Sequence, residues 1–123
     1  MTFFRSRLAA AWLVAAGATL AAPATMAQDL ELSIIAPAGA GGGWDSAARA
    51  LQEVMMSTGN ARSVQVINVP GAGGTVGLAQ FVQGAAGSPN QMLVGGITMV
   101  GAIITNKAPY DLTAVTPIAR LTG

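Results

Sequence analysis

The sequence predicts an α/β fold built on a parallel sheet, and three observations lead to that prediction. Strand-like segments alternate along the chain with segments of helical spacing, an order that joins parallel strands through right-handed crossover helices. Hydrophobic residues make up 52% of the 123 residues and charged residues only 9%, a composition typical of strands that are buried on both faces. Glycine-rich loops stand at the first two strand-to-helix junctions, where open α/β sheets bind ligands.

The first strand and helix are predicted over residues 31–36 and 44–57. Residues 31–36 alternate and then run apolar, which indicates a strand. From Trp44 onward, apolar residues recur every three or four positions, so residues 44–57 are expected to form a helix with one apolar face. Gly59 follows as a C-terminal stop signal.

The same alternation continues to the end of the chain. Residues 63–69 predict a second strand, and Thr75 is expected to cap a second helix that extends to residue 86. A third strand is predicted over 91–97, a short helix over 98–105 and a fourth strand over 116–121. The last predicted strand runs to the end of the chain, and a four-strand sheet needs both faces covered, so we expect a truncated domain. A strand that leaves the first part of one lobe toward a missing second lobe would end in this way.

The N-terminal segment is typical of a secretory signal peptide. Arg5 and Arg7 precede an apolar stretch over residues 8–22, and small residues stand at Thr25 and Ala27. That stretch is shorter than the about 20 residues that a membrane-spanning helix needs. We therefore expect cleavage after Ala27 and a domain over residues 28–123 in the periplasm.

Composition excludes several classes of function. The chain contains no Cys and no His, which excludes a thiol nucleophile, a Ser-His-Asp relay and a Cys/His zinc site. Residues 28–123 carry four basic and five acidic side chains that are scattered, so the basic footprint needed for nucleic acid is missing. We expect a binding protein without cofactor, metal or catalytic residues.

The two glycine loops predict a site for an anion. They read P-A-G-A-G-G-G-W-D at 37–45 and V-P-G-A-G-G-T at 69–75, and each follows a strand and opens a helix. Parallel strands bring such loops to one edge of the sheet, where helix N-termini offer unpaired N–H groups and the positive ends of their dipoles. Glycine lets the backbone approach a ligand closely. Since neither loop contains Lys or Arg, the pattern favours reversible capture of a carboxylate by backbone groups, hydroxyls and water.

Residues of both loops and of the third junction are the expected ligand site. They are Ala38, Gly41, Gly42, Gly43, Trp44, Asp45, Ala72, Gly73, Gly74, Thr75 and Thr98. Asp45 is expected to hydrogen-bond the loop backbone, because a carboxylate would repel an anionic ligand. Trp44 is either a core residue or a wall of the site, and the Thr98 hydroxyl either binds ligand or caps a helix. Arg49 and Glu53, four residues apart, are expected to form an exposed ion pair.

A nucleotide- or phosphate-binding enzyme fragment is the main alternative. The dinucleotide-binding fingerprint G-x-G-x-x-G is incomplete in the first loop, because Trp44 stands where the third glycine belongs. The sequence G-K-[ST] of a Walker-type phosphate loop does not occur. Asn68 ends the second predicted strand, where a dinucleotide site has an acidic residue for the ribose. These departures disfavour nucleotide binding.

Three motifs resemble one family of transport receptors. The motifs are P-A-G-A-G-G-G-W-D-S-A-A-R (37–49), N-V-P-G-A-G-G-T-V-G (68–77) and T-P-I-A-R-L (116–121). They resemble the Bug-type periplasmic receptors, the substrate-binding component of tripartite tricarboxylate transporters. Trp44 and the run Met55-Met56-Ser57 look like the citrate-binding branch.

That resemblance implies a two-lobed Venus-flytrap receptor of the type II periplasmic-binding class. In such receptors the first two loops grip a carboxylate, largely through backbone groups and bridging waters. The implied partners are a di- or tricarboxylate and the membrane permease subunits of the transporter. A carboxylate-sensing partner of a signalling system is the alternative role.

Overall fold

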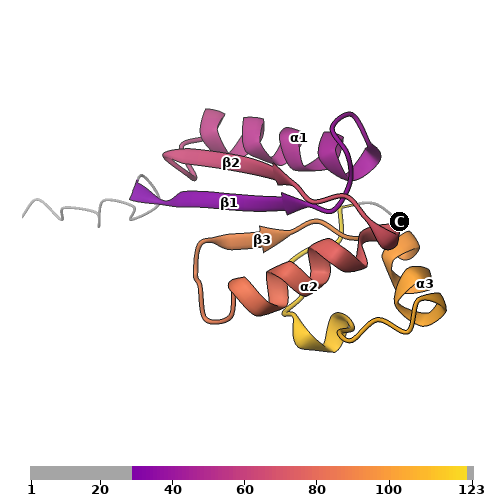
Figure 1. Cartoon of the computed structure of the whole chain (residues 1–123). Coiled ribbons are helices and arrows are strands. Elements are labelled where there is room, and N and C mark those ends of the chain that lie inside the picture. The colour runs from indigo at the N-terminus through magenta and orange to yellow at the C-terminus, as the bar shows by residue number, and fades with distance from the viewer. Residues whose placement is uncertain (1–28, 122–123) are drawn as a thin grey trace, which may run out of the picture.

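Residues 29–121, described by a computed structural model, form a mixed α/β unit around a small parallel sheet (Figure 1). The elements along the chain are β1 (Glu31–Ala36), α1 (Gly43–Ser57), β2 (Ser63–Asn68), α2 (Thr75–Gly84), β3 (Gln91–Leu93) and α3 (Ile97–Thr105). Two 3-10 helices, η2 (Ala72–Gly74) and η3 (Leu112–Ala114), complete the list. The α/β class predicted from the alternation of strands and helices is therefore confirmed.

The sheet has the order β2-β1-β3, with both neighbours parallel to the central strand β1. Ala36 at the end of β1 is in register with Asn68 at the end of β2. All three strands therefore deliver the chain to the same edge of the sheet, and each is followed there by a helix.

Alternation along β1 divides its side chains between two apolar layers. Leu32, Ile34 and Ala36 are buried in a cluster with Ala48 of α1 and Val64 of β2. Side chains at neighbouring positions of a strand point to opposite faces, so the buried Ile35 points to the other face of the sheet. Figure 1 shows α1 along β2 and β1, and α2 on the opposite side of the sheet.

Two of the predicted strands differ from the structure. Residues 116–121 are irregular and exposed rather than a fourth strand, and the side chain of Ile118 is 75% exposed. Pro117 lacks the N–H that a sheet ladder requires, which weakens this segment as a strand. The third strand ends at Leu93 instead of residue 97, because Gly95 and Gly96 offer no side chains to pack.

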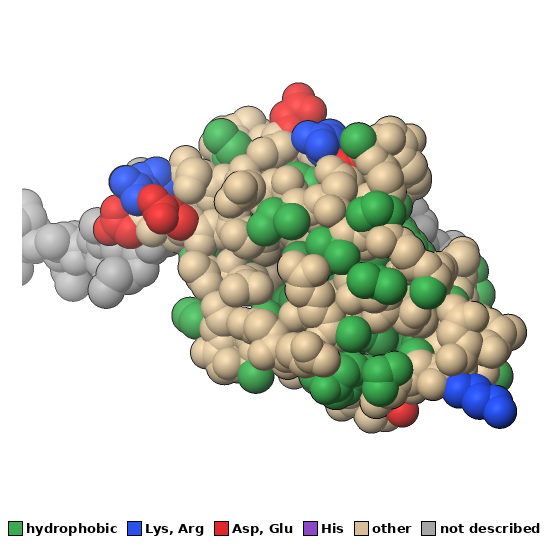
Figure 2. All heavy atoms as spheres, viewed as in Figure 1, with side chains coloured by type: hydrophobic (Ala, Val, Ile, Leu, Met, Phe, Trp, Pro, Cys, Tyr) green, Lys and Arg blue, Asp and Glu red, His purple; other side chains and the backbone are tan. Residues whose placement is uncertain are grey.

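The surface carries few charges. Figure 2 shows charged side chains only around the periphery of the viewed face, with apolar side chains across its centre. Within residues 29–121 no helix has the length and apolar character that crossing a membrane requires. The predicted signal peptide over residues 1–27 lies outside the residues that the structure describes.

Candidate functional site

Three strand-to-helix junctions meet at the carboxyl edge of the sheet. The second junction packs on the third, since a Cβ added to Gly73 would lie 2.5 Å from the Cβ atom of Ala102 in α3. The first junction reaches both others through Trp44. A Cβ added to Gly74 would lie 2.8 Å from Cζ3 of that indole, and one added to Gly96 would lie 3.2 Å from its Nε1. The indole therefore lies between the second and third junctions.

Trp44 has both of the roles that the sequence left open. Its half-buried side chain packs against the core cluster beneath α1, and it also lines a hollow at the edge of the sheet. This hollow has a volume of about 280 Å³ and is open to solvent. Its lining residues are Ala38, Gly43, Trp44 and Thr98.

The hollow thus brings together four of the eleven predicted site residues, from the first and third junctions. Thr98 belongs to the first turn of α3, where its side chain is exposed at the hollow. The predicted residues of the second loop do not line the hollow. Three of them, Ala72, Gly73 and Gly74, form the 3-10 helix η2. Gly41, Gly42 and Asp45 do not line the hollow either. They take part in hydrogen bonds within the first junction, from the Gly41 N–H to Asp45 and from the Gly42 N–H to the Gly39 oxygen.

None of the three helices has a side-chain cap at its N-terminus. The N-cap residues are Gly42 for α1, Gly74 for α2 and Gly96 for α3, and none of these positions has a side-chain cap hydrogen bond. The N–H of Thr75 donates to the Ala72 oxygen, and that of Met99 to the Gly96 oxygen. Glycine caps leave the remaining first-turn N–H groups to water or to a ligand, at the positive end of each helix dipole. An anion is the ligand that such an arrangement favours.

The prediction that Thr75 caps α2 is wrong. Thr75 is the first residue of the helix, is buried, and donates its hydroxyl to the carbonyl oxygen of Ala72 at 3.0 Å. Gly74 takes the cap position with a φ of 95°, a left-handed conformation that glycine adopts without steric cost. The N-cap of α2 is therefore one residue earlier than predicted, at the last glycine of the loop.

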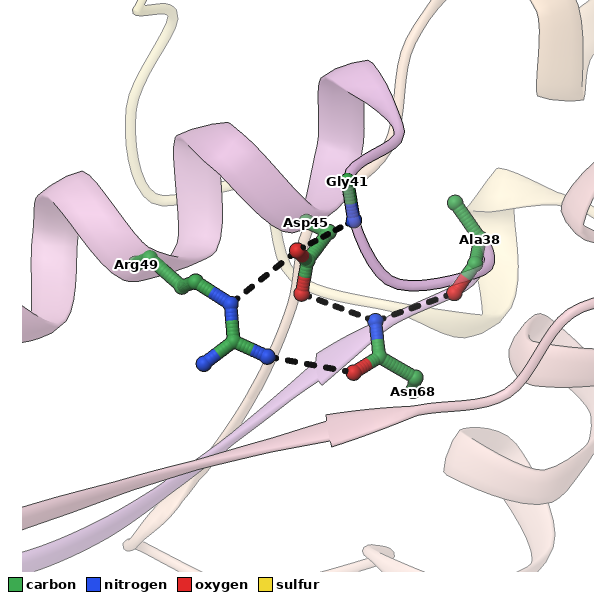
Figure 3. A network of polar contacts seen from close by, with 5 residues as sticks. All are labelled: Ala38, Gly41, Asp45, Arg49 and Asn68. Atoms are coloured by element: carbon green, nitrogen blue, oxygen red, sulfur yellow. Dashed lines mark hydrogen bonds and ion pairs between the residues drawn. The ribbon is translucent and has the colours of Figure 1, made fainter.

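Asp45 is the centre of a polar network behind the first loop (Figure 3). Its carboxylate accepts hydrogen bonds from the Gly41 N–H at 2.8 Å, from Arg49 Nε at 3.0 Å and from Asn68 Nδ2 at 2.9 Å. The side chain is buried, with 3% of the residue exposed. This is the contact with the loop backbone that the sequence led us to expect.

These donors hold the Asp45 carboxyl in its ionised form. The hydrogen bond from Arg49, followed by those from Gly41 and Asn68, lowers the pKa of Asp45 from 3.8 to about 2. At neutral pH the negative charge therefore faces the Arg49 guanidinium. The expected ion pair of Arg49 with Glu53 is wrong, because Arg49 pairs one turn back along α1, with Asp45.

Asn68 is the residue of this network that sequence reasoning missed. Its side-chain amide donates to the carbonyl oxygen of Ala38 at 3.0 Å as well as to Asp45, and its Oδ1 accepts from Arg49 Nη2 at 3.5 Å. The sequence pattern predicted no contact for its side chain. Its position at the end of the second strand, directly before the second glycine loop, was the available signal.

Comparisons of the chain with models of known families, with curated proteins and with solved structures found no match. Over residues 29–121 the structure has no group of three or more acidic side chains that could hold a metal ion. The description of the site therefore depends on its own geometry.

Proposed function

We propose that this chain is a periplasmic solute-binding protein that captures a di- or tricarboxylate such as citrate. The observation that carries the proposal is the meeting of three helix N-termini without side-chain caps at one edge of the sheet, where the junctions before α1 and α3 line an open hollow. Partial positive charge from three helices favours an anion there without a formal cation. The hollow of about 280 Å³ is just below the range for drug-sized ligand sites, about 300–1,000 Å³, as a site for a small acid would be.

The chemistry of the lining favours binding over catalysis. A carboxylate in the hollow would receive hydrogen bonds from backbone N–H groups and from the exposed hydroxyl of Thr98, with the indole of Trp44 as an apolar wall. Asp45 accepts hydrogen bonds from three donors, is buried and does not line the hollow. No lining side chain is a base or an activated nucleophile, which supports reversible capture.

The wider role follows from the sequence motifs. The predicted signal peptide supports a periplasmic location, and the resemblance to Bug-type receptors supports delivery of the acid to the permease of a tripartite tricarboxylate transporter. In this proposal residues 29–121 form part of the first lobe of a two-lobed receptor of the type II periplasmic-binding class, and the open hollow is one wall of its cleft. Lobe closure would then complete the contacts of the ligand.

A matched pair of glycine substitutions tests the proposal. Gly43 lines the hollow, and a Cβ at this position would have no atom within 4 Å, so Gly43→Ala adds a methyl group to the site without disturbing the fold. Gly84→Ala, at the end of α2, is the control because its Cβ also has no atom within 4 Å and lies outside the hollow. Calorimetric titration of the full chain with citrate is the measurement.

The proposal predicts saturable citrate binding that Gly43→Ala weakens by about tenfold or more and Gly84→Ala leaves unchanged, given the cost of a displaced ligand hydrogen bond. Succinate and acetate, titrated in parallel, show how many carboxylate groups the site requires. Saturable binding of NAD or of inorganic phosphate, with no response to any carboxylate, would instead support the nucleotide alternative.

A further inference from the structure

Each of the two glycine loops has one backbone carbonyl that is held by an asparagine from outside the loop. We propose that Asn68 and Asn106 are positioning residues of the site, which keep these carbonyl oxygens turned away so that the loops present N–H groups to an anion. The inference rests on the proposed function and extends it to two residues that do not line the hollow. The two cases arise in different elements, at the end of β2 and at the C-cap of α3.

The first carbonyl belongs to Ala38. Asn68 Nδ2 donates to its oxygen at 3.0 Å and to Asp45 Oδ1 at 2.9 Å, so both hydrogens of the amide group are used. The Asn68 oxygen in turn lies 3.5 Å from Arg49 Nη2. This closed network, drawn in Figure 3, fixes the orientation of the amide, and the amide fixes the carbonyl of Ala38.

The second carbonyl belongs to Ala72. Its oxygen accepts from Asn106 Nδ2 at 3.1 Å, from the Thr75 hydroxyl at 3.0 Å and from the backbone N–H of Thr75, so Asn106 is its one donor from outside the loop. Ala72 also has a φ of 46°, a left-handed conformation that is unfavourable for alanine. A strained residue persists where its surroundings determine it strongly, and here donors from two residues in different elements, Thr75 and Asn106, hold the same carbonyl.

The orientation of a carbonyl fixes the orientation of the next N–H. Residues 29–121 contain no cis peptide bond, and in a trans peptide unit the C=O and N–H groups point in opposite directions. With the carbonyls of Ala38 and Ala72 held by the asparagines, the N–H groups of Gly39 and Gly73 point away from them. Each asparagine thereby removes an oxygen that would repel an anion and directs a donor toward the other side of its loop.

The test compares three asparagine-to-alanine variants of the full chain. Asn68→Ala and Asn106→Ala each remove one positioning amide, while Asn60→Ala is the control, because its amide donates to Thr58 Oγ1 just beyond the C-terminal end of α1. Citrate affinity is expected to fall by about five- to tenfold in each positioning variant, which corresponds to the loss of one oriented hydrogen bond. Asn60→Ala is expected to bind citrate as the unaltered chain does.

Amide NMR of the unliganded chains gives a readout that a general loss of stability does not produce. Asn68→Ala is expected to shift the resonance of Gly39 most, and Asn106→Ala that of Gly73, with the other loop little changed. Citrate affinity and loop resonances that match those of the unaltered chain in both variants would overturn the inference and leave the proposed function intact.

Two further outcomes are also decisive. If the unaltered chain binds no carboxylate, the proposed function fails, and the glycine resonances alone decide whether the asparagines orient the loops. If Asn68→Ala does not fold, Asn106→Ala decides the inference, because Asn106 is exposed and the oxygen of Ala72 keeps its hydrogen bonds from Thr75.

Discussion

Gly74→Ala is predicted to destabilise the fold because Gly74 lies where the three junctions are packed together. The residue is buried, and its φ of 95° is in the left-handed region, where alanine costs about 1–2 kcal/mol. A Cβ would lie 2.8 Å from Cζ3 and 3.0 Å from Cη2 of Trp44, so the indole must move. Movement is restricted, because the indole lies against Gly96 on its other side.

The expected size of the effect follows from these two contributions. Forcing an extra carbon into a packed site costs about 1–3 kcal/mol, while the stiffer unfolded chain returns about 0.4–1 kcal/mol. The methyl group of Met99, 3.0 Å from the new Cβ, ends a flexible side chain and can move aside at little cost. We therefore expect a net loss of about 3 kcal/mol in the free energy of unfolding.

Urea denaturation followed by far-ultraviolet circular dichroism measures this loss, with Gly84→Ala as the control. That control adds the same methyl group, in the last turn of α2, with no atom within 4 Å and no positive φ. It is expected to change the free energy of unfolding by less than about 1 kcal/mol, in the stabilising direction. A loss below about 0.5 kcal/mol for Gly74→Ala, the size of an ordinary surface change, would refute the described packing of Trp44.

Three other predictions test the network, the core and the surface. The pKa of Asp45 is lower in the folded chain, about 2, than its ordinary value of 3.8, so its contribution to stability is complete above about pH 4 and is lost as the pH falls toward 2; urea midpoints between pH 6 and pH 2.5 should therefore fall less in Asp45→Asn than in the unaltered chain, and equal falls would contradict the network. Ile34→Ala removes a side chain that is 0% exposed and should cost about 2–5 kcal/mol in urea denaturation, whereas Ile97→Ala, 84% exposed, should cost less than about 0.5 kcal/mol, and similar costs would contradict the assignment of the core. Arg62→Ala breaks an exposed ion pair with Glu31 and should change the free energy of unfolding by less than about 1 kcal/mol, so a larger loss would show that this pair is more than a surface contact.

Local patterns were sufficient to predict most of the fold. Apolar spacing predicted a helix from Trp44, one residue after the observed start of α1 at Gly43. Alternation of apolar and polar residues located β1 and β2. These signals arise from neighbours in the sequence, which is why they are visible there. The placement of β1 between its two partners is a property of the whole chain, and the sequence did not predict it.

The features that were missed depend on contacts between distant residues. Asn68 contacts Ala38 across 30 positions, and no short-range pattern marks such a hydrogen bond. Arg49 has one acidic residue four positions before it, Asp45, and one four positions after it, Glu53. The tertiary structure selects Asp45, because Asn68 and Gly41 already hold that carboxylate in place. Residues 116–121 show the opposite error, since an apolar pattern that predicted a strand is irregular in the structure, with Pro117 unable to donate to a sheet ladder.

The most direct test of the central claim is an amide NMR titration of the chain with citrate, observed at the glycine loops. We expect saturable shifts for the amides of residues 39–43 and 71–74 and for Thr98, all at the carboxyl edge of the sheet, and no response of these amides to NAD. A well-dispersed spectrum in which citrate, succinate and acetate leave all of these amides unmoved would contradict the proposal that this edge binds a carboxylate.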